Sequence, residues 1–272
     1  MKQRSTNGRN GVSAGTRAVE RALLVLGAVG DADEEPGLSE LAESIGLHKT
    51  TAFRLLGALE RAEFVVRDLD RQRYRLGPAL LRLATQARRS TGLHEATRPE
   101  LEALSDATGE TATIEVLIGE EVLILDEAHG RFIVGGTPEV GTRWPAHATS
   151  TGKVLLAAAR FEGEGKPASR QRAARLVKLG PRTITSRAAL ERELAKVWRA
   201  GYAVGREELE PGFIAISAPV RNAQGRTVAA MSIGGPKTRL TEGRVAQVVA
   251  RVRQAARRVS QRLGDPTAFQ DA

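Results

Sequence analysis

Residues 49–54 place cationic and hydroxyl side chains at a spacing suited to nucleic-acid contact. Lys49, Thr50, Thr51 and Arg54 accompany apolar residues at 52, 55, 56 and 59, which recur at helical spacing. If the apolar residues are buried, these four side chains lie on the outer face of a helix. An α-helix fits the major groove, where hydroxyl and guanidinium groups bind base edges. The spacing therefore predicts a DNA-recognition helix.

A second cationic group, Arg67, Arg71 and Arg73, lies in and beside a polar stretch flanked by residues 64–66 and 73–76. The two flanking segments have strand-like composition and predict a short β-hairpin. We expect the three arginines, together with Lys49, to contact phosphate. Two alternatives remain: an ordinary solvated helix with surface arginines, or a winged fold that binds protein.

The elements that must position these side chains are predicted in the order helix, helix, short turn, helix, hairpin. The buried faces are expected to comprise Val19, Ala22, Leu23 and Leu26 in residues 16–29; Leu38, Leu41, Ala42 and Ile45 in the second helix; and Ala52, Leu55, Leu56 and Leu59 in residues 49–62. Gly46 follows the second helix, as a helix C-terminus prefers. This order is typical of a winged helix-turn-helix domain.

Motifs for catalysis are incomplete. Residues 151–154 resemble the end of a phosphate-binding loop, but His147 and Val154 replace its first glycine and its final hydroxyl residue. A zinc-protease pattern would begin at His94, yet Arg98 occupies the position of the second histidine. We therefore expect no enzyme, no metal site and no cofactor. The competing enzyme hypothesis would use Glu207 or Glu208 as a base, although a run of acids is usually a solvated surface.

Length and composition indicate two domains. The chain has 272 residues, of which 41% are hydrophobic and 27% charged, and it has no cysteine, which excludes disulfides. No apolar run is long enough for a membrane helix, so we expect a cytoplasmic protein with no membrane partner. The net charge of +9 favours a polyanionic partner. Basic residues exceed acidic ones by fifteen to eleven in residues 1–92 and by twenty-six to twenty-one afterwards, so charge alone does not locate a DNA site.

The predicted division follows changes in periodicity. We expect a flexible basic arm over residues 1–15, the winged helix-turn-helix domain over 16–77, a linker helix over 78–92, an α/β domain over 93–264 and a tail over 265–272. The linker helix is predicted to direct Leu80, Leu83, Ala84 and Ala87 inward. Within the α/β domain, helices are expected near 95–108, 150–159, 170–179, 187–200 and 241–263. Strands are expected near 111–118, 121–128, 202–205, 213–220 and 227–233, with 131–135 as a further candidate.

Seven stretches in this order resemble the IclR family of bacterial transcriptional regulators. They are RAVERALLVL (17–26), LSELA (38–42), KTTAFRLL (49–56), WPAHATSTGK (144–153), GY (201–202), REELEPG (206–212) and SIGGP (232–236). The resemblance covers about residues 16–264. It implies an α+β protein whose second domain is GAF-like, with a curved antiparallel sheet, flanking helices and an effector pocket. It also implies dimerisation through the DNA-binding domains, with dimers often pairing into tetramers.

Carried over by position, the resemblance implies an effector pocket lined by Trp144, Ser150, Thr151, Gly205, Phe213, Ala215, Ser232 and Gly234, with Ile133 as a further candidate. Members that bind small carboxylates have polar groups at several of these positions, whereas this chain has Gly205, Ala215 and Gly234. We therefore expect a larger, drier pocket for a small organic acid, with an aromatic acid as the leading candidate. Amides at the helix start near Ser150 would hold the carboxylate. Alternatively, Trp144 and Phe213 belong to the core or to an interface.

The function predicted from these residues is ligand-responsive, sequence-specific DNA binding in control of a catabolic or metabolic operon, more often as a repressor. The expected partners are double-stranded operator DNA, a small-molecule effector and further copies of the chain. The alternative is a small-molecule sensor whose winged helix mediates protein assembly. The sequence does not decide whether two basic segments contact DNA or are solvated surface. They are the arm with Lys2, Arg4 and Arg9, and the last helix with Arg244, Arg251, Arg253, Arg257, Arg258 and Arg262.

Overall fold

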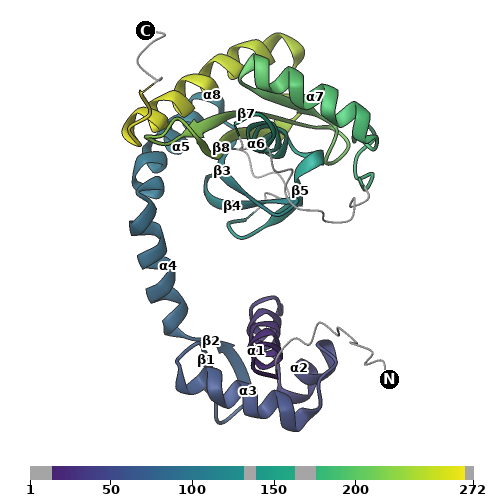
Figure 1. Ribbon diagram of the computed structural model, residues 1–272, viewed down its shortest axis with the longest axis vertical. Coiled ribbons are helices and arrows are strands. Elements are labelled where there is room, and N and C mark those ends of the chain that lie inside the picture. Colours follow the sequence, from purple (N-terminus) through teal and green to yellow (C-terminus); the bar gives the residue numbers. More distant parts are fainter. Residues whose placement is uncertain (1–13, 132–138, 163–175, 267–272) are drawn as a thin grey trace, which may run out of the picture. The chain divides into compact units, whose positions relative to one another are not determined.

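The chain forms two units, Met1–Ser90 and Thr91–Ala272 (Figure 1). The computed structural model describes residues 14–131, 139–162 and 176–266. Residues 1–13 of the predicted arm, residue 133 and most of the predicted tail lie outside these residues, while residues 14 and 15, also predicted as arm, belong to the first helix. None of the described helices is long and apolar enough to cross a bilayer.

The first unit has the predicted order of elements. It contains α1 (Ala14–Gly30), α2 (Leu38–Ser44), α3 (Lys49–Arg61), the hairpin of β1 (Val65–Asp68) and β2 (Arg73–Leu76), and α4 (Pro78–Thr91). Gly46 adopts a φ of 64° just beyond α2, a left-handed conformation that glycine accommodates without strain. The short segment after it lets α3 begin at Lys49, which fixes the direction of the predicted recognition helix.

The core of this unit confirms the predicted inner face of α3 and corrects that of α1. Ala52 and Leu56 are buried, and Leu55 and Leu59 are half-buried. In α1, Val25 and Val29 are buried instead of Val19 and Leu23, whose side chains are 61% and 63% exposed. Apolar side chains occur on most sides of α1, so the sequence periodicity did not determine which side is buried. Packing against α3 and β2 selects that side.

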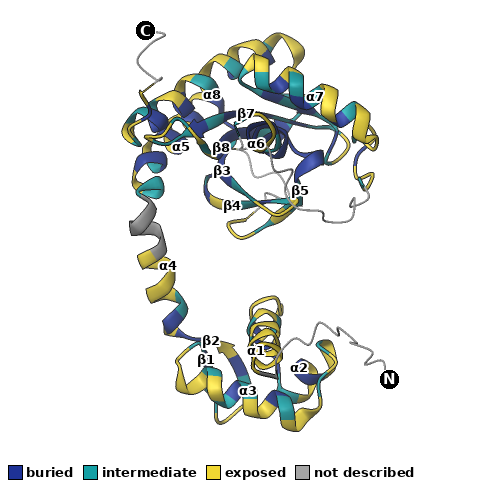
Figure 2. Cartoon of the chain, viewed as in Figure 1, coloured by how far each residue is buried: buried dark blue, intermediate teal, exposed yellow. Residues whose placement is uncertain are grey.

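The prediction that one face of α4 is buried is also wrong for the single chain. Leu83 and Ala84 are exposed and Leu80 is half-buried, whereas Ala79 at the helix start is buried (Figure 2). The side chain of Ala87 lies outside the described part. The start of α4 is held by the segment between α3 and β1, where the Ala79 N–H donates to the Glu63 carbonyl.

The second unit is a six-stranded antiparallel sheet covered by helices on both faces, which confirms the predicted α+β fold class. Its elements are α5 (Leu93–Thr108), β3 (Thr111–Ile118), β4 (Glu121–Ala128), β5 (Arg143–Pro145), the 3-10 turn η1 (Ala146–Ala148), α6 (Ser150–Phe161), α7 (Arg187–Ala200), β6 (Ala203–Arg206), β7 (Phe213–Arg221), β8 (Thr227–Pro236) and α8 (Glu242–Arg262). The strand order is β5-β4-β3-β8-β7-β6.

Alternation along the strands divides the sheet into two different faces. Ile114, Ile216 and Ile233 belong to the core formed with α5 and α8. Their neighbours Thr113, Ala215 and Ser232 turn to the opposite face and line a cavity beside α6. Because successive strand residues point to opposite faces, one β-sheet supplies both a dry core and a ligand-sized cavity.

Two predictions for the second unit do not match the structure. Residues 176–179, the described part of the expected helix 170–179, are not helical. Conversely, β5 forms where no strand was expected, and it pairs with β4 with Trp144 opposite Val122. The further candidate strand at 131–135 lies almost wholly outside the described residues.

Candidate nucleic-acid interface and ligand cavity

The outer face of α3 presents the side chains predicted to recognise bases. Lys49, Thr50 and Arg54 are exposed, while Thr51 is half-buried. Phe53, beside Arg54, is also 50% exposed. A helix that buries Ala52 and Leu56 and exposes cationic and hydroxyl groups can present those groups to a DNA groove.

The three hairpin arginines have different surroundings. Arg71 is exposed at the turn. Arg67 is half-buried, hydrogen-bonds to Gln72 and lies over the rings of Phe53 and Tyr74, with its guanidinium carbon 5.9 and 5.7 Å from their centroids. Arg73 donates to Glu40 at 2.7 Å and to the Glu35 carbonyl at 3.0 Å. Arg71 is therefore the predicted phosphate contact with the most accessible guanidinium group.

A cavity of about 130 Å³ lies between the sheet and the start of α6. All eight residues expected to form the pocket line it: Trp144, Ser150, Thr151, Gly205, Phe213, Ala215, Ser232 and Gly234. They come from β5, α6, β6, β7 and β8, so segments up to ninety positions apart in the sequence meet at one site.

The N-terminus of α6 supplies hydrogen-bond donors to the cavity. Thr149 is the N-cap, and its hydroxyl accepts from the Gly152 N–H at 2.9 Å. The first N–H groups of a helix have no acceptor within the helix, so those of Ser150 and Thr151 remain to be satisfied. The Ser150 hydroxyl is also buried, with no hydrogen-bond partner among the described residues. This arrangement can bind an anionic oxygen.

The glycines of the cavity do not all create empty space, contrary to our expectation. A Cβ on Gly234 would lie 2.6 Å from the ring of Phe213, so the aromatic ring occupies the volume that a side chain would need. A Cβ on Gly205 would make an ordinary contact of 3.5 Å with the Ser150 nitrogen. Gly205 thus keeps the start of α6 uncovered, whereas Gly234 accommodates Phe213.

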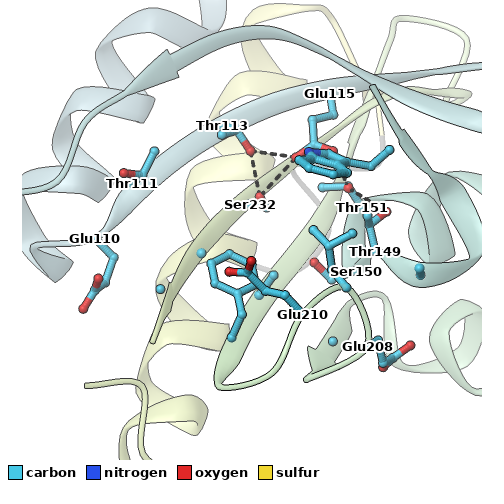
Figure 3. Close-up of a pocket in the computed structure, with 18 of the residues that line it drawn as sticks. Glu110, Thr111, Thr113, Glu115, Thr149, Ser150, Thr151, Glu208, Glu210 and Ser232 are labelled. Carbon is cyan, nitrogen blue, oxygen red and sulfur yellow. Dashed lines mark hydrogen bonds between the residues drawn. The ribbon is translucent and has the colours of Figure 1, made fainter. Parts of the chain in front are cut away.

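The cavity is also more polar than expected, because β3 contributes Thr113 and Glu115 (Figure 3). Glu115 accepts hydrogen bonds from Thr113 at 2.8 Å and from Thr151 at 2.5 Å. Burial raises the pKa of Glu115, and its hydroxyl partners oppose that rise. Sequence reasoning missed this cluster, although polar residues at 111, 113 and 115 in an otherwise apolar strand were a usable signal.

Two ion pairs border the same cavity. Arg239 forms a bidentate pair with the buried Glu110, at 2.7 and 2.6 Å. Lys153, which is fully buried, donates to Glu208 at 2.6 Å and to the Val204 carbonyl at 3.2 Å. Burial raises the pKa of Glu208, and the Lys153 ammonium opposes that rise. The two candidate bases, Glu207 and Glu208, are therefore both engaged, since Lys237 pairs with Glu207 at 3.0 Å.

Comparison with known proteins identifies the family. A family model described as the bacterial transcriptional regulator IclR C-terminal matches residues 85–261, and one described as the IclR helix-turn-helix domain matches residues 18–69. The transcriptional regulator BhcR of Paracoccus denitrificans (strain Pd 1222) is 33% identical over 248 residues, which cover 91% of this chain and 88% of BhcR. The chain belongs to the IclR family.

Solved structures of IclR proteins show the same fold. The Thermotoga maritima IclR has a TM-score of 0.72 at 27% identity, covering 91% of this chain and 99% of that one. An IclR homologue from Microbacterium hydrocarbonoxydans, complexed with 4-hydroxybenzoate, has a TM-score of 0.77 at 28% identity, covering 90% and 98%. This chain is accordingly a ligand-responsive, DNA-binding transcriptional regulator of the IclR family and not an enzyme.

The arginines of α8 serve packing in several cases. Arg258 and Arg262 donate to the buried Glu100 at 2.8 and 2.9 Å, and Arg244 donates to the Thr108 carbonyl. Arg253 lies 5.9 Å from the Tyr202 ring centroid. These contacts join α8 to α5 and to Tyr202, the residue before β6, which supports the packing interpretation of the basic last helix over the nucleic-acid interpretation.

Proposed function

We propose that this IclR-family protein binds a specific operator and controls a catabolic or metabolic operon, as a repressor, in response to a small organic acid. Thr50, Thr51 and Arg54 would recognise bases, and Lys49 and Arg71 would contact phosphates. Arg67 and Arg73 would position the hairpin through their contacts with Phe53, Tyr74 and Glu40. Because a bacterial regulator meets its operator DNA in the cytoplasm, we place this action there.

The cavity beside α6 is the observation that carries the effector proposal. Its unpartnered Ser150 hydroxyl and first-turn N–H groups suit a carboxylate. Trp144 and Phe213 add flat apolar surface for the rest of the ligand. An aromatic acid combines both features. The related structure complexed with 4-hydroxybenzoate supports this class without identifying the effector of this chain.

Self-association completes the proposed mechanism. Val19, Leu23 and Leu24 of α1 and Leu81 of α4 are 57–73% exposed in the single chain, which is a large apolar surface for one small unit. We propose that copies associate as a dimer, or as a dimer of dimers, so that two winged helices bind two half-sites together. Effector binding would change their spacing through α4, and a shift of a few Å would release one half-site.

Fluorescence anisotropy tests the proposal with DNA from upstream of the gene and a scrambled duplex of equal length at physiological salt. We expect a preference of about a thousandfold for the upstream DNA. Addition of an aromatic acid should then weaken that binding. Weak binding to both duplexes that disappears with salt would indicate charge alone. That result would favour the alternative of a sensor whose winged helix mediates protein assembly.

A further inference from the structure

Among the acidic side chains described in the cavity, Glu115 alone has hydrogen-bond partners that are all hydroxyl groups. Its Oε1 accepts from Thr113 at 2.8 Å and from Ser232 at 3.5 Å, and its Oε2 accepts from Thr151 at 2.5 Å. The side chain is 6% exposed. Figure 3 shows Thr113 and Ser232 joined to this carboxyl group by hydrogen bonds, and Thr149 and Ser150 line the same cavity.

The other acids of the cavity differ from Glu115. Glu110 is paired with Arg239, Glu208 is paired with Lys153, and Glu210 is exposed. The ionisable groups on the neighbouring strand β4 and helix α6 are also paired: Glu121 with Arg143, Asp126 with Arg98 and His94, Glu127 with His129, Lys153 with Glu208 and Glu193, and Arg160 with Glu191. Strand β8 carries no ionisable side chain. No described cation therefore neutralises Glu115.

A carboxyl group in this position has two chemically different uses. If ionised, it would repel a carboxylate and select a cationic ligand. If protonated, it can donate a hydrogen bond, because threonine and serine hydroxyls accept as well as donate and can rearrange around either form. The donors that line the same cavity, the Ser150 hydroxyl and the first N–H groups of α6, favour an anionic ligand there. Only the protonated form is compatible with those donors acting on one anionic ligand.

We propose that Glu115 binds the effector as a neutral carboxyl group that donates a hydrogen bond to an anionic oxygen, so that effector and one proton bind together. This inference rests on the proposed organic-acid effector. It adds a specificity residue to the cavity and makes the regulator sensitive to pH. The proton comes from solvent whenever Glu115 is ionised in the free protein, and it returns to solvent when the ligand leaves.

Titration calorimetry of the full chain tests this inference with benzoate, 4-hydroxybenzoate and pyruvate as anionic probes and benzylamine as a cationic probe. Each is titrated at pH 6 and pH 9, in buffers of different ionisation enthalpy. For the probe that binds, we expect affinity to fall about tenfold for each pH unit above the pKa of Glu115, with one proton taken up for each ligand bound in that range. Operator binding without effector is measured in parallel as the readout of proper folding.

Two variants separate Glu115 from other titrating groups. Glu115→Gln keeps a hydrogen-bond donor at every pH, so it should bind the acid at pH 6 and lose most of the pH dependence. Glu120→Gln removes an exposed carboxyl group from the same unit, outside the cavity. It should keep the wild-type pH dependence.

The outcomes distinguish this inference from the function on which it rests. Equal affinity for an acid at both pH values, or unchanged pH dependence in Glu115→Gln, would overturn the role of Glu115 and leave the effector proposal standing. Tighter binding of benzylamine at pH 9 would show an ionised Glu115 that selects cations. Failure of every acid to bind at either pH would reject the effector class, and the Glu115 inference with it.

Discussion

Arginines of the first unit with the same chemistry have different surroundings, which is why we propose different functions for them. Arg54 is exposed on α3, whereas Arg73 is engaged with Glu40 and the Glu35 carbonyl. A free guanidinium group can form a bidentate contact with guanine, but an engaged one must first give up its partner. At the scale of the residue, exposure therefore separates a base-contact candidate from a positioning residue.

Replacing Arg54 tests this distinction. Arg54→Ala should weaken operator binding by about 1–3 kcal/mol and relax the preference at one base position. Arg73→Ala serves as the comparison: its partly exposed ion pair contributes about 0–1 kcal/mol to stability, and its removal should not alter base preference. Binding is measured on operators substituted one base pair at a time. A reduction of affinity by Arg54→Ala that is equal on every sequence would assign Arg54 to the phosphate backbone instead.

Glu115 also gives a prediction about stability that requires no ligand. Because burial raises its pKa in the folded state, the folded chain retains a proton that the unfolded chain has released. The free energy of unfolding should therefore decrease as pH rises above the unfolded value of about 4.3, until the folded pKa is passed. Glu115→Gln should show a smaller decrease. Urea unfolding at pH 5 to 9, compared between the two proteins, measures the difference, and parallel curves would contradict a raised pKa.

Helix α6 shows how one element serves both the cavity and the core. Its first turn presents Ser150 and Thr151 to the cavity, and one turn later Lys153 is buried against Glu208. The Lys153–Glu208 pair connects the helix to the segment after β6, which also lines the cavity. The position of α6 thus depends on an ion pair whose lysine is fully buried and whose glutamate is nearly so.

Removing one partner of that pair should be costly. Lys153→Met leaves Glu208 and Glu193 without their shared cation and should destabilise the second unit by about 3–5 kcal/mol. The double variant Lys153→Met with Glu208→Gln should recover part of this stability. Both tryptophans, Trp144 and Trp198, lie in the second unit, so their fluorescence during urea unfolding reports on that unit alone. Equal stability of Lys153→Met and wild type would show that the pair is dispensable.

At the scale of the whole molecule, the charge of +9 is divided between two units with different uses for arginine. In the first unit, Arg54 and Arg71 are exposed, whereas in the second Arg239, Arg258 and Arg262 bind buried glutamates. Net charge consequently overstates the number of cations available to DNA. A salt titration counts the cations that contact phosphate.

The basic arm gives a prediction of this kind. Deletion of residues 1–12 removes Lys2, Arg4 and Arg9, and should lower the slope of log affinity against log salt by about 0.9 for each phosphate that the arm neutralises. Operator binding by the shortened and full-length chains is measured across the same salt series. An unchanged slope would show that the arm does not bind phosphate.

The periodicity of the sequence was sufficient to predict most helices and strands, because each depends on residues within a few positions of one another. The expected α3, α7 and β7 begin at the observed residues. Family-specific stretches such as residues 144–153 also led to the eight cavity residues before any contact was known. The prediction of the buried face failed for α1, because apolar residues extend around the helix and local spacing does not select one side. The strand β5 was missed because it forms only by pairing with β4.

The sequence by itself determined the order of the elements in the first unit, the family and the identity of the groups on α3, since each is encoded in local spacing and residue type. Only the tertiary structure decided which polar groups meet. Glu115 contacts Thr151 and Ser232, which are 36 and 117 positions away, through the register of β3 with β8 and the placement of α6. The physical reason is that burial, and with it the protonation of a carboxyl group, depends on packing between segments that are distant in the chain.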